Sequence, residues 1–151
     1  MNYVEEAIGV GLAAQRAGMP VAISFTVETD GRLPTGQTLQ SAIEQVDATT
    51  AAWPAYYMIN CAHPTHFAHV LRDGGNWLDR IHGIRANASH RSHAELNEAT
   101  ELDIGDPAEF GRQYAALANA LPNLNVMGGC CGTDLRHLAQ IAAACAIRPA
   151  G

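Results

Sequence analysis

The sequence predicts an α/β fold of the (β/α)8 TIM-barrel type, and three observations lead to this prediction. Apolar segments with helical and with strand periodicity alternate along the chain, which is typical of a parallel sheet with right-handed crossovers. The side chains best suited to chemistry fall where the predicted strands end, and both barrels and open α/β sheets bind ligands there. No predicted strand leads into a phosphate-binding glycine loop of the dinucleotide type, which favours the barrel over the open sheet.

The first helix and the first strand have clear periodic patterns. Residues 4–17 place apolar side chains at helical spacing, and Gly18 with Pro20 ends this helix. Residues 21–28 alternate with period two, so one face of this strand is apolar while the other is small and polar and ends on Glu28. A small, polar face of this kind also suits a barrel interior near an active site.

The next two helices and the second strand continue the alternation. A loop rich in turn residues covers 29–36, and an amphipathic helix is predicted over 37–50. The second strand covers 56–61 and ends on a cysteine. Pro64 opens the third helix, which is predicted to end at Leu71, before a pair of glycines.

The second half of the chain is less regular. The third strand, 84–89, is short and only partly apolar, and the alternation of elements is the main reason to predict it. Residues 90–106 are expected to form a long irregular excursion over one end of the fold. The pattern is completed by three predicted elements: a helix over 107–121, a strand over 124–129 and a final helix over 134–146.

Composition predicts a single domain, 1–151, with an apolar core. The chain has 151 residues, 48% of them hydrophobic, and a formal net charge of -6. It has no cluster of basic residues, so nucleic acid is not an expected partner. No apolar run is long enough to cross a bilayer, and Glu5 and Glu6 stand where a secretory signal would carry basic charge. We therefore expect a cytoplasmic protein that does not bind membranes.

Three of the four cysteines lie at strand ends. Cys130 and Cys131 follow the fourth strand, and Cys61 ends the second. In a reducing compartment, cysteines are more often free, catalytic or metal-bound than paired in disulfides. Three thiolates from strand ends predict a zinc ion whose fourth position is open, as in catalytic zinc sites. The backbone must leave strand geometry beside the adjacent pair, and three glycines allow this: Gly128, Gly129 and Gly132.

Two other interpretations of these residue types stay open. A cysteine can simply fill space in the core, and this is the expected role of Cys145 within its alanine-rich segment. A structural zinc site can also be drawn from Cys61 and three nearby histidines, His63, His66 and His69. A proline interrupts their spacing, which favours histidines that cap or decorate the third helix.

Two motifs in the sequence are similar to those of a known family. The first motif is Asn60-Cys61, which follows an apolar strand. The second lies about seventy residues later and reads Gly128-Gly129-Cys130-Cys131-Gly132-Thr133. Together they resemble the zinc-binding signature of the homocysteine S-methyltransferases. The resemblance covers essentially the whole chain. It implies that Zn2+ is the cofactor and that its ligands are the thiolates of Cys61, Cys130 and Cys131. It also implies methyl transfer from a donor to the thiol of homocysteine, or of a close thiol or selenol analogue, which gives methionine.

The resemblance further implies three residues that contact the substrate. Glu28, at the end of the first strand, resembles the acid that holds the amino group of the substrate in some members. Asn60 is similar to the asparagine before the first cysteine of the family, and Asn87 stands where members carry an asparagine near the substrate. No catalytic general base is expected, because metal binding itself ionises the substrate thiol.

The resemblance also places the chain in the C-terminal half of a barrel. Members of the family are about twice this length, in line with the roughly 250 residues of a typical (β/α)8 barrel. The four predicted strands are similar to strands five to eight of the family fold. We therefore expect a homodimer or an N-terminal half-barrel partner to complete the barrel. The alternative is a non-catalytic zinc-binding half-barrel that serves as a fragment or a subunit.

Overall fold

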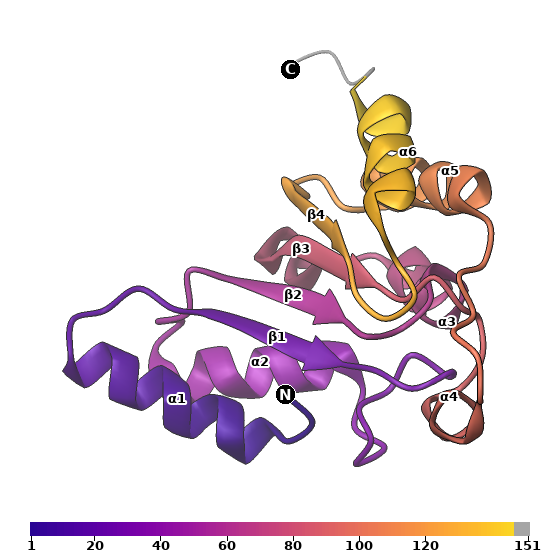
Figure 1. Cartoon of the computed structure of the whole chain (residues 1–151). Helices are drawn as coiled ribbons and strands as arrows, with labels where there is room; N and C mark the ends of the chain where they lie inside the picture. The colour runs from indigo at the N-terminus through magenta and orange to yellow at the C-terminus, as the bar shows by residue number, and fades with distance from the viewer. Residues whose placement is uncertain (147–151) are drawn as a thin grey trace.

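A four-stranded parallel sheet forms the centre of the fold. The computed structural model describes residues 1–146, so residues 147–151 of the predicted domain lie outside the described part. The strand order in the sheet follows the chain: β1 (Ala22–Thr26), β2 (Tyr56–Asn60), β3 (Ile81–Ala86) and β4 (Val126–Gly129) (Figure 1). All neighbouring pairs are parallel, which confirms the predicted α/β fold with a parallel sheet.

Helices pack against one face of this sheet. The longest are α1 (Val4–Arg16), α2 (Leu39–Thr50), α5 (Pro107–Ala120) and α6 (Leu135–Cys145). Figure 1 shows α1 and α2 beside β1 and β2, and α6 beside β4. The apolar core lies between these helices and the strand side chains that alternate toward them, such as the buried Phe25 and Ile59. No helix in residues 1–146 is long and apolar enough to cross a membrane.

The opposite face of the sheet is open. Register places Thr26, Asn60, Arg85 and Gly128 in one row across it, and all four are half-buried or exposed. We call this face the inner face. Consecutive strands are neighbours throughout, whereas a doubly wound sheet reverses its strand order. The sheet is therefore consistent with part of an α/β barrel.

The third strand differs from its prediction. β3 covers Ile81–Ala86, so it begins and ends three residues earlier than the predicted 84–89. Gly83 resembles a turn residue in the sequence, but in the strand its missing side chain leaves room for Met58. A Cβ at this glycine would lie 2.5 Å from the Cγ of Met58. Packing between strands, rather than local pattern, therefore sets where β3 begins.

Helical structure also differs from its prediction in two places. The predicted helix over 64–71 is divided, and three short segments join β2 to β3: α3 (Pro64–Phe67), η1 (Val70–Asp73) and η2 (Asn76–Arg80). The segment predicted as irregular, 90–106, contains helix α4 (His93–Glu98). A capping box in which Ser92 and Glu95 exchange hydrogen bonds starts this helix.

Tyr114 of α5 ties the ends of the last two strands together. Its ring is fully buried, and its hydroxyl accepts from the backbone N–H of Ala86 (3.0 Å) and donates to the carbonyl oxygen of Gly128 (2.5 Å). Burial raises the pKa of Tyr114, so its hydroxyl keeps the proton that it donates. The ends of β3 and β4 are therefore fixed relative to each other, which positions the residues that follow them.

Candidate metal centre

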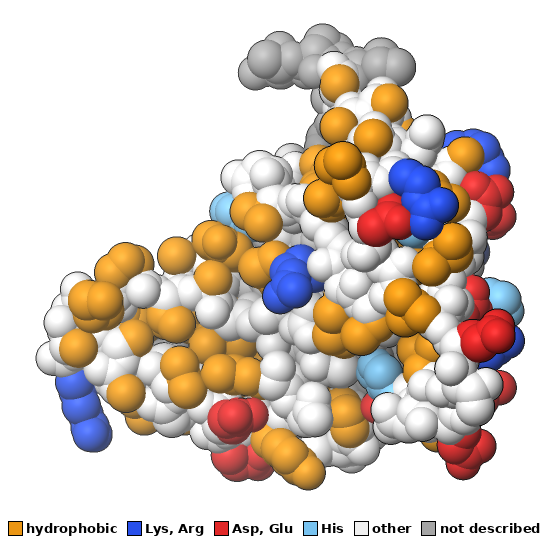
Figure 2. Space-filling view, viewed as in Figure 1, with side chains coloured by type: hydrophobic (Ala, Val, Ile, Leu, Met, Phe, Trp, Pro, Cys, Tyr) orange, Lys and Arg blue, Asp and Glu red, His pale blue; other side chains and the backbone are white. Residues whose placement is uncertain are grey.

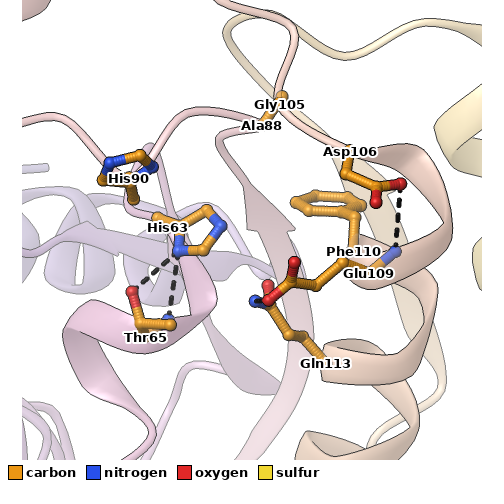
Figure 3. Close-up of a pocket in the computed structure, with 9 residues that line it drawn as sticks. All are labelled: His63, Thr65, Ala88, His90, Gly105, Asp106, Glu109, Phe110 and Gln113. Atoms are coloured by element: carbon orange, nitrogen blue, oxygen red, sulfur yellow. Dashed lines mark hydrogen bonds between the residues drawn. The ribbon is translucent and has the colours of Figure 1, made fainter.

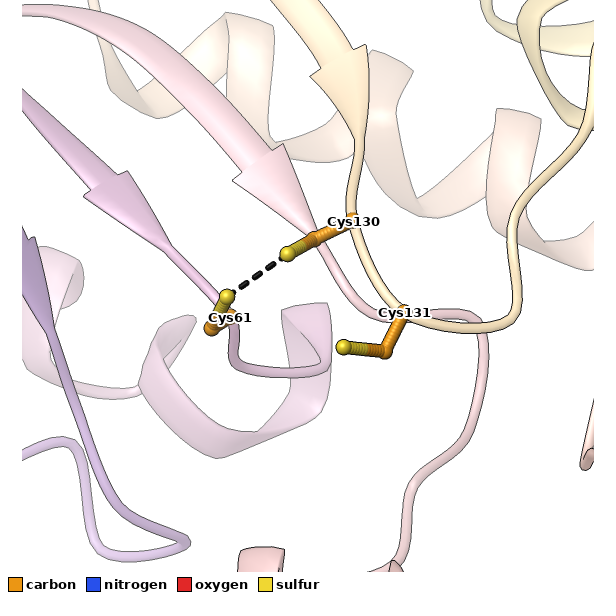
Figure 4. A group of neighbouring side chains, drawn as sticks. All are labelled: Cys61, Cys130 and Cys131. Atoms are coloured by element: carbon orange, nitrogen blue, oxygen red, sulfur yellow. Dashed lines mark hydrogen bonds between the residues drawn. The ribbon is translucent and has the colours of Figure 1, made fainter.

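Three thiols meet at the carboxyl end of the sheet. Cys61 directly follows β2, and Cys130 with Cys131 directly follows β4 (Figure 4). Their Sγ atoms all lie within 4.8 Å of one another, and those of Cys61 and Cys130 are 2.6 Å apart. Among the side chains that the structure describes, no other group of three or more His, Cys, Asp or Glu brings its ligand atoms this close.

This donor set fits a zinc ion. Zinc–thiolate bonds of about 2.3 Å in a tetrahedral site place any two sulfurs about 3.8 Å apart. The Sγ atoms of Cys61 and Cys130 are 2.6 Å apart, and all three Sγ atoms lie within 4.8 Å of one another, so side-chain rotations can bring the three thiols to bonding distance. A set of three protein ligands leaves a fourth position for water or substrate, as in catalytic rather than structural zinc sites.

Cys61 departs from strand geometry. Its φ is 55°, in the left-handed region that non-glycine residues seldom adopt. Its backbone N–H donates to the carbonyl oxygen of Arg85 (2.9 Å). Its own carbonyl oxygen accepts from Asn87 Nδ2 (3.0 Å) and from His93 Nε2 (2.5 Å). These bonds hold a strained residue in place, and such residues are concentrated at functional sites.

Glycines allow close approaches beside Cys130 and Cys131. A Cβ at Gly129 would collide with the side chain of Thr133, whose hydroxyl donates to the carbonyl oxygen of Cys130 (2.7 Å). Gly132 has a φ of 76°, and a Cβ there would collide with a carbonyl oxygen of the loop that follows α4. At Gly132 the backbone therefore leaves strand geometry, as the sequence predicts.

The segment 85–88 lies between the two thiol-bearing segments and bonds to both. It continues β3 past the last strand residue, with residues 61–62 on one side and residues 130–131 on the other. Four backbone hydrogen bonds of 2.8–3.0 Å make these links: Cys61 N–H to Arg85 O, Asn87 N–H to Ala62 O, Cys130 N–H to Ala86 O, and Ala88 N–H to Cys131 O. This segment therefore sets the spacing between the cysteines.

The side chain of Asn87 adds a second link between the same segments. Its Nδ2 donates to the carbonyl oxygen of Cys61 (3.0 Å), and its Oδ1 accepts from the backbone N–H of Cys131 (3.2 Å). Only 2% of this residue is exposed. The amide thus acts as a bridge within the thiol centre, and its expected contact with a substrate stays a prediction.

The surroundings of Cys61 disfavour the ionised form of its thiol. Burial raises the pKa of the Cys61 thiol, and the neighbouring Cys130 raises this pKa further. The positive charge of Arg85 lowers the same pKa but has a smaller influence. A divalent cation would favour the ionised thiols, because it supplies the opposite charge at bonding distance.

Glu28 and His93 border the thiol centre. Glu28 lies just beyond β1, and each of its carboxylate oxygens is 3.3 Å from His93 Nδ1. The Glu28 and His93 side chains are 38% and 34% exposed, so a ligand can reach both. Together with Cys61 and Asn87 they line one small recess. The structure therefore brings together three of the residues that the sequence nominates: Glu28, Cys61 and Asn87.

His93 lies beside the thiol centre, a position that the sequence does not indicate. In the sequence it stands in the polar segment His90-Arg91-Ser92-His93, which could bind an anion or simply form a loop. It is the first residue of α4, within the segment 90–106 that is predicted to be irregular. The Ser92-x-x-Glu95 spacing is a recognisable start of a helix and could have located α4. No local signal indicates that His93 reaches the carbonyl oxygen of Cys61, because that contact spans 32 residues of sequence.

Asn60 lies on the inner face, one residue before Cys61. Its Nδ2 donates to the hydroxyl oxygen of Thr26 (3.0 Å), and the hydroxyl of Ser24 donates to its Oδ1. The amide thus ties β2 to β1 next to the thiol centre. Its expected contact with a substrate also stays a prediction.

In the described part of the chain, the alternative zinc site of Cys61 and nearby histidines does not form. Nδ1 of His63 accepts from the backbone N–H of Thr65 (3.4 Å), and burial lowers the pKa of His63 to about 4. His66 Nε2 donates to a backbone carbonyl oxygen before α4 (2.8 Å), and His69 is exposed. His63 therefore caps α3, and His66 joins α3 to the chain before α4.

A separate pocket of about 320 Å³ opens beside the start of α5 (Figure 3). His63 and Thr65 lie on one side of it, and Phe110 and Gln113 lie on the other. The lining residues include none of the three thiols. This pocket is therefore not part of the candidate metal centre.

The chain matches the sequence model of a known protein family. A sequence model described as homocysteine S-methyltransferase matches residues 1–145. The matched range contains all four strands and the three thiols at their ends. The match thus extends over the fold and the candidate metal centre together.

Proposed function

The chain belongs to the homocysteine S-methyltransferase family, and we propose that it binds Zn2+ and transfers a methyl group to the thiol of homocysteine. Cys61, Cys130 and Cys131 are the proposed zinc ligands. The observation that carries this proposal is the position of their Sγ atoms, all within 4.8 Å at the carboxyl end of one parallel sheet. Ligands bind at this end in α/β folds, and family membership supplies the class of reaction.

Cys61, Cys130 and Cys131 would hold the zinc ion through their thiolates and leave its fourth position to the substrate thiol, and the bound ion would favour loss of the proton from that thiol and so make it nucleophilic. Without this help the thiol is mostly protonated at neutral pH, because its pKa is about 8.5. The proton passes to solvent, and the sulfur attacks the methyl carbon of the donor. The bond between that carbon and the donor breaks, with its electron pair left on the donor. The segment 85–88 holds the three cysteines at the spacing that this chemistry needs.

Replacement of Asn87 by alanine should weaken zinc binding about 10- to 100-fold, the usual effect of removing a group that orients metal ligands. The substitution removes the amide that bridges the Cys61 carbonyl oxygen and the Cys131 N–H. Competition with a chromophoric chelator measures the affinity. Asn97→Ala, at an exposed position of α4, is the matched control and should bind zinc as wild type does. Unchanged affinity in Asn87→Ala would reject this positioning role.

Glu28→Gln should weaken homocysteine binding by about 1.5 to 3 kcal/mol, the range for a hydrogen bond to a charged group. The proposed role of this carboxylate is to hold the substrate ammonium, since it borders the same recess as Cys61. Zinc content should stay unchanged. Calorimetric titration of the zinc-loaded protein is the measurement, with Glu6→Gln on the exposed surface of α1 as control. Equal homocysteine affinity in Glu28→Gln and wild type would leave Glu28 only as a partner of His93.

The proposed barrel requires a partner. We propose that β1 to β4 are strands five to eight of a (β/α)8 barrel, because helices pack on one face of the sheet while the inner face is open, and β1 and β4 are its edge strands. Four further strands from a second copy, or from an N-terminal half-barrel partner, would close this sheet. Closure would also surround the thiol centre and keep bulk water from the reacting sulfur.

Formation of methionine tests the proposed function. The zinc-loaded protein is incubated with homocysteine and, in separate reactions, with betaine, S-methylmethionine, methylcobalamin or methyltetrahydrofolate, because no residue identifies the donor. We expect methionine with one of these donors, and only when zinc is bound and the inner face is covered. A zinc-loaded, closed assembly that forms no methionine with any of them would reject the proposal.

A further inference from the structure

Arg85 carries the only charge within the strands of the sheet. The four strands contain no other Arg, Lys, Asp or Glu. Register puts Arg85 on the inner face, in one row with Thr26, Asn60 and Gly128. Figure 2 shows mainly hydrophobic and uncharged side chains over the middle of the molecule. Arg85 is therefore the single charged group that the strand residues present on the inner face.

The guanidinium of Arg85 has no acidic partner among the described side chains. Arg80, Arg91 and Arg136 each form an ion pair with an aspartate. No carboxylate among the described side chains lies within 4.0 Å of the Arg85 nitrogens. The residue is exposed, and its stem passes over Gly128, where a Cβ would lie 3.8 Å from Arg85 Cγ. Its charge is thus available to an anionic ligand.

Arg85 and Glu28 stand beside the thiol centre with opposite charges. Arg85 is paired in register with Asn60, the residue before Cys61, and its carbonyl oxygen accepts from the Cys61 N–H (2.9 Å). Glu28 continues the inner-face alternation of β1 and borders the recess at Cys61. A thiol-binding centre with a carboxylate and a guanidinium beside it is complementary to a zwitterionic amino acid that carries a thiol.

We propose that Arg85 binds the carboxylate of the thiol substrate and so selects an amino acid over other thiols. This inference rests on the proposed function, because it assigns the substrate of the same centre. A guanidinium offers two parallel N–H donors that match the two oxygens of a carboxylate, which glutamine cannot reproduce. The link from Arg85 to Cys61 uses the backbone carbonyl oxygen of Arg85, so substitution of the side chain leaves that link in place.

Thiol binding to the cobalt(II)-loaded chain tests this role without turnover. A thiol that enters the fourth position adds a sulfur ligand and changes the absorption spectrum of the cobalt. The two probes are L-homocysteine and 3-aminopropane-1-thiol, which lacks only the carboxylate. The wild-type protein should bind homocysteine about 10- to 100-fold more tightly than the aminothiol. In Arg85→Gln this preference should fall to about one, with the affinity for the aminothiol unchanged.

Arg112→Gln, exposed on α5, is the matched control and should keep the full preference. Equal binding of the two thiols by wild type, or a full preference in Arg85→Gln, overturns the role of Arg85 and leaves the proposed function intact. Equal weakening of both thiols in Arg85→Gln also overturns it, because the residue then supports the metal centre and not the carboxylate. Cobalt-loaded wild type whose spectrum responds to neither thiol rejects the proposed function itself.

Discussion

Replacement of both adjacent cysteines by serine, Cys130→Ser and Cys131→Ser, should reduce the zinc content from about one ion per chain to none. The double variant keeps only one of the three thiols that lie within 4.8 Å of one another. Binding of zinc by a set of thiolates releases about 10 to 16 kcal/mol at neutral pH, and most of this is lost with two of three ligands. Elemental analysis after gel filtration measures the zinc content.

The matched control for this prediction is Cys145→Ser. Cys145 lies at the end of α6 and is not a member of the three-thiol group, so this variant should keep its zinc. Zinc that persists in the double variant would require a donor set other than these cysteines. Loss of zinc from Cys145→Ser would show that the ligand set includes a cysteine outside the strand ends.

The 151-residue chain should self-associate, and its monomer should form no detectable methionine. The sheet ends in two edge strands, β1 and β4. At the outer edge of β1, Met1 donates to the carbonyl oxygen of Ser24 (2.6 Å) and accepts from the Thr26 N–H (2.9 Å), so β4 is the edge at which a further strand can pair without displacing another segment. The inner face is open between them, with Ala22, Arg85 and Val126 exposed. Two copies that pair edge to edge would cover this face and complete eight strands. Light scattering and a methionine assay on the same fractions measure both properties.

Val126→Lys places a charge on the exposed edge strand β4 and should weaken this association. Met19→Lys, at an exposed position between α1 and β1, should leave it unchanged. A monodisperse, cooperatively folding and active monomer would contradict the half-barrel interpretation. A closed, zinc-loaded assembly without activity would instead identify the non-catalytic half-barrel.

The order of the elements could be predicted because most of them carry their own pattern. β1 and β2 both lie within their predicted ranges, 21–28 and 56–61, since each alternates buried and less buried residues. β3 does not carry such a pattern. Its glycine at position 83 is explained only by Met58 on the neighbouring strand, so its start could not be read locally. Helix α4 was predictable in principle from its capping box.

The sequence could also predict that the three cysteines lie close together in space, because parallel strands end at the same edge of a sheet. It could not predict the groups that hold Cys61 and Cys131 in place. Asn87 reaches Cys131 across 44 residues of sequence, and His93 reaches Cys61 across 32. Such contacts depend on the path of the loops, which periodicity does not determine. The sequence therefore identifies the thiols themselves but not the network that spaces them.

Zinc K-edge X-ray absorption on the reconstituted protein, with and without homocysteine, tests the central claim most directly. Without homocysteine, we expect three sulfur ligands at about 2.3 Å and one lighter ligand, because Cys61, Cys130 and Cys131 leave the fourth position open. With homocysteine, the lighter ligand should be replaced by a fourth sulfur. A spectrum with four sulfurs before homocysteine is added, or one that homocysteine does not change, would contradict a substrate-binding zinc centre.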